Sequence, residues 1–305
     1  MTASPAPHRA VLLAGGKGSR LHPLTLTISK QLLAVYDKPM VYYPLTTLLL
    51  GGAREILVVS DPTHEPRFRA LMGDGARWGI SISYAPQHEP RGIAEALIIA
   101  EEFIADGPAM LMLGDNVLYG RYDFLRAAVT DSGDHATVFA YHVEDPTGYG
   151  VVEIADDGRV LSIEEKPEMP RSHWVVPGLY LYPPGVAEEA RRLVPSARGE
   201  LEITDLHRRY LDQGRLRARR MGRGTAWFDT GTVQDLLEAS SFIEAIQRRQ
   251  GLLVGCPEEV AFRMGLIGVD ELQGLVDDLP ECSYRTYLQR VLEDKEWPVP
   301  PDPPS

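Results

Sequence analysis

Short apolar runs alternate with longer amphipathic stretches through the first half of the chain. The apolar runs predict strands at 10–14, 55–60, 81–86 and 109–114. Between them, apolar residues recur every three or four positions, which predicts helices near 40–51, 65–72 and 92–104. The run Ala109–Leu113 is apolar at every position, as is typical of a strand buried on both faces of a sheet. The alternation predicts an α/β fold with a doubly wound, mostly parallel sheet.

After residue 135 the pattern changes to extended runs with little helix between them. These runs lie at 136–143, 149–154, 159–165 and 174–182. The segment Asp156-Asp157-Gly158 favours a hairpin turn between two of them. We therefore expect a mixed or antiparallel extension of the sheet.

Helices return in the last third of the chain, near 203–213 and 233–250. Thr232 is a suitable N-cap for the second, and Gly251 follows its end. Residues 257–293 predict two or three short amphipathic helices, whose apolar stripes need the core or a neighbouring subunit as a packing surface. The stripes comprise Val260, Phe262, Leu266, Leu272, Leu275, Val276 and Leu279.

The length of 305 residues suits one large α/β domain, or one domain with an appendage. We predict a core at 1–250, with one part at about 1–135 and a second at about 136–232. A helical appendage and a Pro-rich tail follow at 251–305, and the end from Trp297 to Ser305 is expected to fray.

The chain has a formal net charge of −12, from 31 basic and 43 acidic side chains, which makes it a poor general ligand for nucleic acid. No apolar run approaches the roughly 20 residues of a membrane-spanning helix, and Ala10–Ala14 is too short for a signal peptide. Neither Cys256 nor Cys282 lies in a Cys-x-x-Cys motif, so both are interpreted as structural thiols in a reducing compartment. We expect a cytoplasmic enzyme without nucleic-acid or membrane partners.

The strongest local signal for chemistry is the glycine-rich segment Leu13–Leu21, which follows the first predicted strand. Its glycines allow backbone N–H groups to approach a phosphate, and Arg20 and Lys30 can add positive charge. No Gly-Lys-Ser/Thr closes the segment as in a P-loop, and the third glycine of a dinucleotide fingerprint is missing. On the glycines alone, a tight turn explains the segment as well as a phosphate site does.

With Arg20, Pro23, Lys30 and Pro39 included, this opening resembles that of the sugar nucleotidylyltransferases, and the segment 29–40 resembles the glucose-1-phosphate thymidylyltransferases among them. The resemblance extends to about residue 293. It implies a Rossmann-like sheet with a sugar-binding extension, and transfer of a nucleotidyl group from dTTP to α-D-glucose 1-phosphate with Mg²⁺ as cofactor. The products are dTDP-glucose and pyrophosphate, in the first step of deoxysugar biosynthesis. UTP, another hexose 1-phosphate, or a non-catalytic nucleotide-sugar-binding regulator remain alternatives.

The resemblance also implies which residues form the site. The nucleotide-binding residues it implies are Leu13, Gly15, Gly16, Gly18, Ser19, Arg20, Lys30, Gln87, Gly92 and Asp115. The sugar-phosphate-binding residues it implies are Asn116, Tyr149, Gly150, Glu165, Lys166, Val176 and Arg198. The Gln87 amide can both donate to and accept from a pyrimidine base.

Two acidic residues follow predicted strands far apart in the chain. Asp115 ends the strand at 109–114, at the edge where doubly wound sheets bind ligands, and Asp229 precedes the helix at 233–250. Taken alone, each is better explained as a turn or helix-entry residue. The resemblance implies that both bind Mg²⁺, which takes one or two carboxylates together with phosphate oxygens and water.

The implied reaction needs no general base, because a sugar phosphate with a second pKa of ~6 is mostly dianionic at neutral pH. Accordingly, none of the 8 histidines falls in a catalytic motif. Catalysis is expected to rest on positioning and charge neutralisation by Arg20, Lys30, Lys166 and Asp115.

Four positions depart from the pattern of the thymidylyltransferases. Ser19 stands where Thr is frequent, and Arg91, Glu95 and Pro177 stand where Asp, Gln and Thr are usual. These departures leave the base, effector and sugar preferences open. In the long members of the family, the C-terminal helices take part in a homotetramer and an effector site, so both are expected here.

Overall fold

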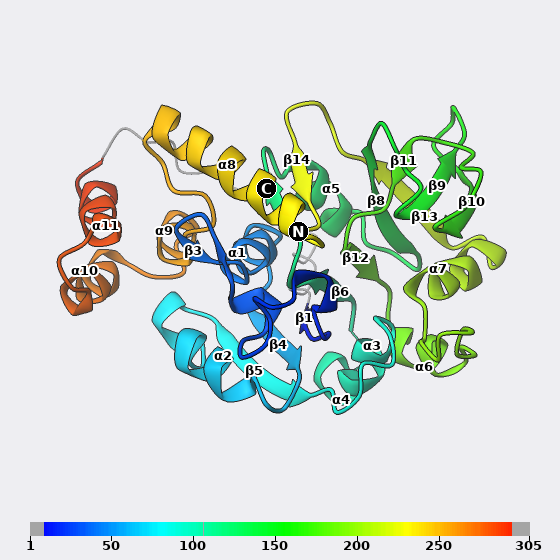
Figure 1. The fold of residues 1–305 in the computed structure, drawn as a ribbon, viewed down its shortest axis with the longest axis horizontal. Helices are drawn as coiled ribbons and strands as arrows, with labels where there is room; N and C mark the ends of the chain where they lie inside the picture. The colour runs from blue at the N-terminus through cyan, green and yellow to red at the C-terminus, as the bar shows by residue number, and fades with distance from the viewer. Residues whose placement is uncertain (1–8, 106, 295–305) are drawn as a thin grey trace, which may run out of the picture.

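A ten-stranded sheet runs through the part of the chain that the computed structural model describes, residues 9–105 and 107–294 (Figure 1). Its order is β10-β9-β11-β8-β12-β6-β1-β4-β5, with β13 paired to β8. The predicted fold class, α/β with a mostly parallel doubly wound part and a mixed extension, is confirmed. The predicted fraying from Trp297 to Ser305 lies outside the described residues.

The first half of the chain supplies the parallel part of the sheet. Its strands are β1 (Arg9–Ala14), β4 (Glu55–Ser60), β5 (Ser81–Pro86) and β6 (Ala109–Leu113). Ala14 lies opposite Ser60, Ser60 opposite Pro86, and Leu13 opposite Leu113. The carboxyl ends of all four strands therefore lie at one edge, where this fold class binds ligands.

The second half adds mainly antiparallel strands on the other side of β6. They are β12 (Leu179–Tyr182), β8 (Ala136–His142), β11 (Trp174–Val175), β9 (Gly150–Ile154) and β10 (Val160–Glu165), with β13 (Leu216–Arg220) parallel to β8. The single strand predicted at 174–182 is wrong, because the chain changes neighbours within it. Val176 N donates to Gly150 O, Pro177 has no N–H, and Gly178 N donates to the side chain of Asn116.

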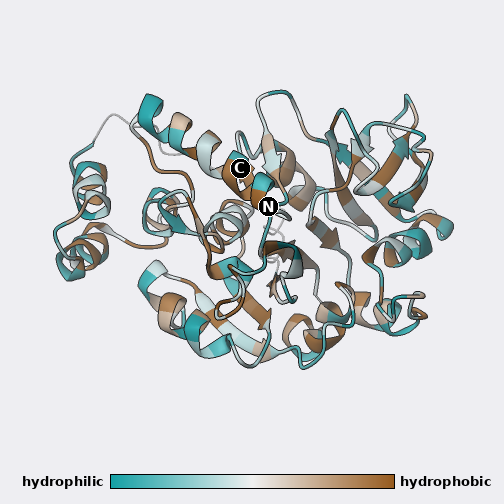
Figure 2. Cartoon of the chain, in the orientation of Figure 1, coloured by the Kyte–Doolittle hydropathy of each residue, from teal (hydrophilic) through white to brown (hydrophobic). Residues whose placement is uncertain are grey.

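Helices cover both faces of the sheet, because successive side chains of a strand point to opposite faces. Leu12 packs in the core that contains Leu45 of α1, and Leu13 packs in the core that contains Leu97 of α3. The first core is covered by α1 (Tyr42–Leu50), α2 (Glu65–Met72) and α5 (Asp123–Thr130). The second is covered by α3 (Glu95–Ile99), α4 (Glu101–Ile104), α6 (Val186–Arg191) and α7 (Ile203–Asp212). Figure 2 shows the central strands coloured mainly as hydrophobic.

The helix predicted at 92–104 is broken and starts later. Gly92 has φ +107, and a Cβ atom on it would lie 2.4 Å from Leu201 O. Leu201 N also donates to Arg91 O at 2.7 Å, so the backbone of this loop is held against a distant segment instead of entering the helix. The tertiary contact overrides the local periodicity.

The C-terminal helices pack on the same chain. Helix α8 (Val233–Gln250) begins with the predicted N-cap, since Thr232 and Asp235 exchange hydrogen bonds. It is followed by α9 (Pro257–Arg263), α10 (Val269–Asp278) and α11 (Ser283–Glu293), which extend to the end of the molecule far from β9 and β10 (Figure 1). Leu272 and Val276 are buried in the core that also contains Leu45, so the predicted apolar stripes find their partner within the chain.

Short elements that the sequence pattern does not reveal complete the fold. They are the pair β2 (Ala34–Val35) and β3 (Lys38–Pro39), the pair β7 (Val117–Tyr119) and β14 (Ala226–Phe228), and the 3-10 turns Ser19–Leu21, Lys30–Leu32 and Ala76–Trp78. No helix among the described residues is long and apolar enough to cross a membrane.

Candidate active site

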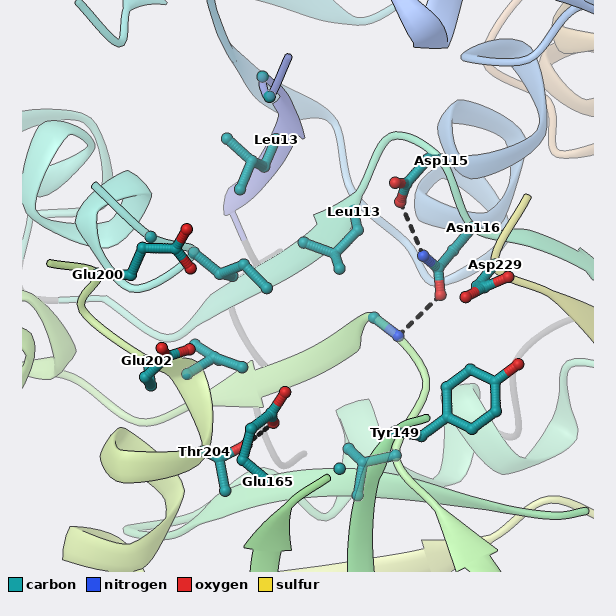
Figure 3. Close-up of a pocket in the computed structure, with 18 of the residues that line it drawn as sticks. Leu13, Leu113, Asp115, Asn116, Tyr149, Glu165, Glu200, Glu202, Thr204 and Asp229 are labelled. Carbon is teal, nitrogen blue, oxygen red and sulfur yellow. Dashed lines mark hydrogen bonds between the residues drawn. The ribbon is translucent and has the colours of Figure 1, made fainter. Parts of the chain in front are cut away.

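A cavity of about 360 Å³ opens at the edge where the parallel strands end (Figure 3). Most of the residues implied for substrate and metal binding line it, from both parts of the sheet. They are Leu13, Gly15, Gly16, Arg20, Gln87, Gly92, Asp115, Asn116, Tyr149, Gly150, Glu165, Lys166, Val176, Arg198 and Asp229. Gly18, Ser19 and Lys30 lie outside the lining.

The glycine-rich loop brings its backbone close to the base side of the cavity. A Cβ atom on Gly15 would lie 2.6 Å from Gln87 Oε1, so a side chain at this position would displace the Gln87 amide. Gly18 has φ +56 and precedes the 3-10 turn that contains Ser19 and Arg20. Of these three residues Arg20 alone lines the cavity, so Gly18 and Ser19 shape the turn that presents it.

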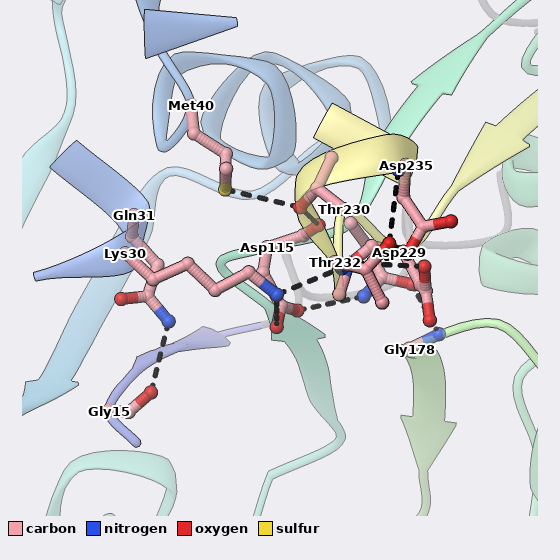
Figure 4. Close-up of polar contacts among 12 residues, drawn as sticks. Gly15, Lys30, Gln31, Met40, Asp115, Gly178, Asp229, Thr230, Thr232 and Asp235 are labelled. Carbon is pink, nitrogen blue, oxygen red and sulfur yellow. Dashed lines mark hydrogen bonds and ion pairs between the residues drawn. The ribbon is translucent and has the colours of Figure 1, made fainter. Parts of the chain in front are cut away.

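Lys30 connects the two predicted metal ligands (Figure 4). Its Nζ donates to Asp115 Oδ2 at 2.8 Å and to the backbone oxygen of Asp229 at 3.3 Å. Thr230, buried with φ +44, donates from Oγ1 to the backbone oxygen of Asp115 at 2.6 Å. The loop after β14 is thereby fastened to the loop after β6, although the two are far apart in sequence.

Asn116 lines the cavity beside Asp115 and is held by three hydrogen bonds (Figure 3). Its Oδ1 accepts from Gly178 N at 2.8 Å and from Trp227 Nε1 at 2.7 Å. Its Nδ2 donates to Asp115 Oδ1 at 2.9 Å. Because Oδ1 already accepts two hydrogen bonds and Nδ2 donates to Asp115, Asn116 orients the Asp115 carboxylate. It also lines the surface that is predicted to meet the sugar.

The electrostatics of Asp229 suit a cation. Burial raises its pKa, and the nearby carboxylates of Asp235 and Asp115 raise it further, while Lys30 and the backbone N–H of Gly231 oppose the shift. Arg20 is also close: a Cβ atom on Gly231 would lie 3.0 Å from Arg20 Nη2 and 3.2 Å from Asp229 Oδ2. Among the described residues there is no group of three or more His, Cys, Asp or Glu placed to hold a metal. Two carboxylates, completed by phosphate and water oxygens, are a ligand set that Mg²⁺ accepts, so Asp115 and Asp229 fit the implied ion.

On the sugar side, the charged groups are held by neighbours on α7 and its preceding loop. Thr204 Oγ1 donates to Glu165 Oε2 at 2.6 Å, and Arg198 Nη2 donates to Glu202 at 2.8 Å. Lys166 has φ +44, an uncommon backbone conformation for a residue with a side chain, and such strain is typical of functional positions. Burial, together with Asp229 and Asp235, raises the pKa of Tyr149 to about 12, so its hydroxyl stays protonated at neutral pH.

Several lining residues escape sequence reasoning because only the fold brings them here. They include Gln31, Leu113, Tyr180, Glu202, Thr204, His207 and Trp227. Burial lowers the pKa of His207 to about 3, and its Nε2 pairs with Tyr182 Oη at 2.8 Å. The imidazole is therefore neutral and structural, which agrees with a reaction that needs no general base.

Two of the sequence departures lie next to Gln87, outside the cavity lining, and pair with each other. Arg91 Nε donates to Glu95 Oε1 at 2.8 Å, and Gln87 Nε2 donates to Glu95 Oε2 at 2.9 Å. Pro177, another departure, lies at the strand break beside Gly178. It leaves the neighbouring hydrogen bonds of Val176 N and Gly178 N in place.

The chain is similar in sequence to known proteins. The nucleotidyl transferase family model matches residues 9–246. The glucose-1-phosphate thymidylyltransferase of Mycolicibacterium smegmatis is 50% identical over 287 residues, covering 93% of this chain and 99% of the relative. That of Xanthomonas campestris pv. campestris (strain B100) is 51% identical over 283 residues, covering 92% and 95%.

Solved structures agree. A Bacillus anthracis protein provisionally assigned as a glucose-1-phosphate thymidylyltransferase, in complex with a sucrose, has a TM-score of 0.72 at 35% identity, covering 77% of this chain and 94% of its own. A UDP-glucose pyrophosphorylase complexed with UDP-glucose has a TM-score of 0.69 at 22% identity, covering 79% and 100%, which supports the fold alone. The chain therefore belongs to the nucleotidyl transferase family and, within it, to the glucose-1-phosphate thymidylyltransferases.

Proposed function

We propose that the protein transfers a thymidylyl group from dTTP to α-D-glucose 1-phosphate, giving dTDP-glucose and pyrophosphate. The observation that carries this proposal is a single cavity lined by the glycine-rich loop and Asp115 on one side and by Glu165, Lys166 and Arg198 on the other. Such a cavity can hold a triphosphate and a sugar phosphate together, which transfer between them requires.

The chemistry is one in-line displacement at the α-phosphorus of the nucleotide. A phosphate oxygen of the sugar phosphate attacks, and the bond from the α-phosphorus to the bridging oxygen breaks, so that pyrophosphate leaves with the electron pair. The nucleophile is already mostly dianionic at neutral pH, since its second pKa is about 6. No proton has to be removed, and the neutral His207 has no part in the transfer.

The residues act by placing positive charge where negative charge gathers. Arg20, which lines the cavity, stabilises charge on the α-phosphate and on the leaving pyrophosphate. Lys30 holds Asp115 and the Asp229 loop together, and contributes charge to the same region. Lys166 and Arg198 bring the incoming phosphate close to another anion, against electrostatic repulsion.

We also propose Mg²⁺ as the cofactor, held by Asp115 and Asp229. The support is the donor set of two carboxylates together with the raised pKa of Asp229, whose burial beside other carboxylates a dication would offset. When bound, Mg²⁺ neutralises charge on the phosphates of the nucleotide.

The test is pyrophosphate release with Mg²⁺, crossing dTTP and UTP with glucose 1-phosphate, glucosamine 1-phosphate and galactose 1-phosphate. Fastest turnover with dTTP and glucose 1-phosphate is expected. Preference for UTP or for another hexose would favour the alternative substrates, because one methyl group is worth only ~1–3 kcal/mol of discrimination. Folded protein without turnover on any pair would instead favour a nucleotide-sugar-binding regulator.

We further propose a cytoplasmic homotetramer that acts first in deoxysugar biosynthesis and binds an effector at its C-terminal helices. An exposed free thiol at Cys282 suits a reducing compartment. A second cavity of about 400 Å³ lies between the end of α8 and helices α9 and α11. Arg263, in its lining, has a buried Nε without a hydrogen-bond partner among the described residues, while Glu259 Oε1 lies 3.8 Å away. Light scattering that shows a monomer would contradict the tetramer.

A further inference from the structure

The amide of Gln87 has both of its hydrogens engaged. Nε2 donates to Glu95 Oε2 at 2.9 Å and to the backbone oxygen of Gly92 at 3.3 Å. Oε1 points to the opposite side, over Gly15, where a Cβ atom would approach it to 2.6 Å. No hydrogen bond between described residues uses this oxygen, and both Gln87 and Gly15 line the cavity. The amide therefore offers the cavity an acceptor only.

Glu95 determines which way this amide faces. A carboxylate can only accept hydrogen bonds, so the NH₂ end of Gln87 has to turn toward it. Glu95 is buried, with 6% of its surface exposed, and its position is fixed from the other side. Oε1 accepts from Arg91 Nε at 2.8 Å and forms an ion pair with Nη2 at 2.7 Å, while Oε2 also accepts from Arg91 N at 3.3 Å.

We propose that Glu95, held by Arg91, is a positioning residue that locks the Gln87 amide with its oxygen toward the nucleobase. The lock selects bases that present an N–H at the matching position of their edge. Thymine and uracil carry a hydrogen on N3, whereas cytosine presents an unprotonated N3 that would face the oxygen of Gln87. Because an unpaired or repelled polar group in a closed site is costly, cytosine nucleotides are rejected. The inference rests on the proposed function in placing the base at Gln87.

Hydrogen-bond donors and acceptors also predict how the Gln87 amide is oriented in variants of Glu95 and Arg91. In E95Q, the guanidinium of Arg91 keeps the oxygen of the new amide, so the new NH₂ group faces Gln87. The Gln87 amide then turns over, giving up its long hydrogen bond to the backbone oxygen of Gly92, and presents its NH₂ to the base. In R91D/E95Q, the introduced carboxylate accepts from the new NH₂ group, the new carbonyl oxygen faces Gln87, and the original orientation returns. R91A is the matched control, because it removes the guanidinium and keeps the accepting carboxylate.

The experiment compares dUTP with dCTP, which share the sugar and differ only at the edge of the base. We would measure kcat/KM for both with glucose 1-phosphate, and calorimetric binding of dUDP and dCDP, in the wild type and the three variants. The dUTP-to-dCTP ratio is expected to fall about tenfold or more in E95Q, in line with the discrimination lost when a base-reading amide is mispaired. It should recover in R91D/E95Q and stay at the wild-type value in R91A.

Other results would overturn the proposal. They are an unchanged ratio in E95Q, equal loss of both nucleotides in E95Q without recovery in the double variant, or a wild type that does not discriminate between the two bases. The binding measurement separates this inference from the proposed reaction. The wild type could turn over no sugar phosphate and still bind dUDP more tightly than dCDP, with this preference lost in E95Q. In that case the proposed reaction is wrong, and the proposed role of Glu95 is supported.

Discussion

On the nucleotide side of the cavity, Lys30 and Gln87 expose 7% and 5% of their surface, whereas on the sugar side the side chains of Lys166 and Arg198 expose 51% and 53%. Lys30 joins the loops after β6 and β14 by hydrogen bonds, and Gln87 donates to Glu95 and to the backbone oxygen of Gly92. In the second pair, Lys166 forms an ion pair with Glu165, and Arg198 forms ion pairs with Glu202 and Glu200. Exposed ion pairs of this kind stabilise little, so the sugar-side cations are free to reorient. The nucleotide side is thus organised before substrate arrives, and the sugar side is completed by it.

This difference predicts that substitutions on the nucleotide side lower kcat and those on the sugar side raise KM for the sugar phosphate. D115N tests the first part with the largest expected effect. It keeps the shape of the side chain and an oxygen that accepts from Lys30 Nζ, while its NH₂ group replaces the oxygen that accepted from Asn116 Nδ2. It removes the charge that a dication needs. We expect kcat to fall by about 10³-fold, the upper range for loss of one preorganised electrostatic contact. Pyrophosphate release checks this, and an unchanged unfolding temperature would show that the fold is intact. Near-normal kcat would remove Asp115 from the mechanism.

R20A is expected to have the next largest effect. Arg20 lies close to Asp229 and Gly231 at the nucleotide end of the cavity. Its charge acts on groups that become more negative during transfer, so we expect kcat to fall about 100-fold while KM for the sugar phosphate changes little. Steady-state kinetics with each substrate varied in turn would separate the two constants. A rise in KM for dTTP alone would make Arg20 a binding residue without a part in the transfer.

R198A and K166A test the sugar side. Because each cation meets the incoming phosphate from a partly exposed position, we expect KM for glucose 1-phosphate to rise about tenfold, and KM for dTTP to stay unchanged. The matched control is R192A, which removes another half-exposed arginine that pairs with Glu188 on α6, away from the cavity. The opposite pattern, a fall in kcat with no change in KM, would mean that the sugar side is as rigid as the nucleotide side.

The same contrast explains what the sequence could predict. The glycine-rich loop and Asp115 lie directly after strong strand patterns, so local periodicity and the edge rule for parallel sheets locate them. The position of Asp229 depends on β7 and β14, two three-residue strands that leave no periodic signal and pair only once the sheet has formed. The engagement of Asn116 by Trp227 and Gly178 requires three distant segments to meet, and residue type alone does not show it.

The departures at Arg91 and Glu95 illustrate the same limit. As single positions they leave the base preference open. The structure shows that their side chains form an ion pair with each other. The late start of the helix predicted at 92–104 has a similar cause, because Gly92 is held against Leu201 by a contact that no local pattern encodes. The sequence therefore predicts a site residue well when a single strand or helix positions it. It predicts poorly the residues that are positioned by contacts between distant segments.

D229N has the smallest expected effect, and it should stabilise the protein. It tests whether preorganisation on the nucleotide side lowers the free energy of unfolding. The folded-state pKa of Asp229 is raised by burial and by Asp235 and Asp115, so the metal-free native state binds its proton more tightly than the unfolded chain does. Stability from this group is therefore present at low pH and falls as pH rises through the carboxyl range toward the raised pKa. Removing the charge should stabilise the protein at neutral pH, and the side-chain oxygen can still accept from Gly231 N. Allowing for partial solvent screening, we expect the unfolding temperature without Mg²⁺ or nucleotide to rise by roughly 1–2 °C, about 0.5 kcal/mol for a chain of this size.

Scanning calorimetry of both proteins at pH 7 and near pH 4 would check the sign, because the difference should shrink at the lower pH, where the wild-type carboxyl gains its proton. A lower unfolding temperature for D229N at neutral pH would mean that the Asp229 charge stabilises the metal-free fold, and that this side of the cavity carries no electrostatic strain.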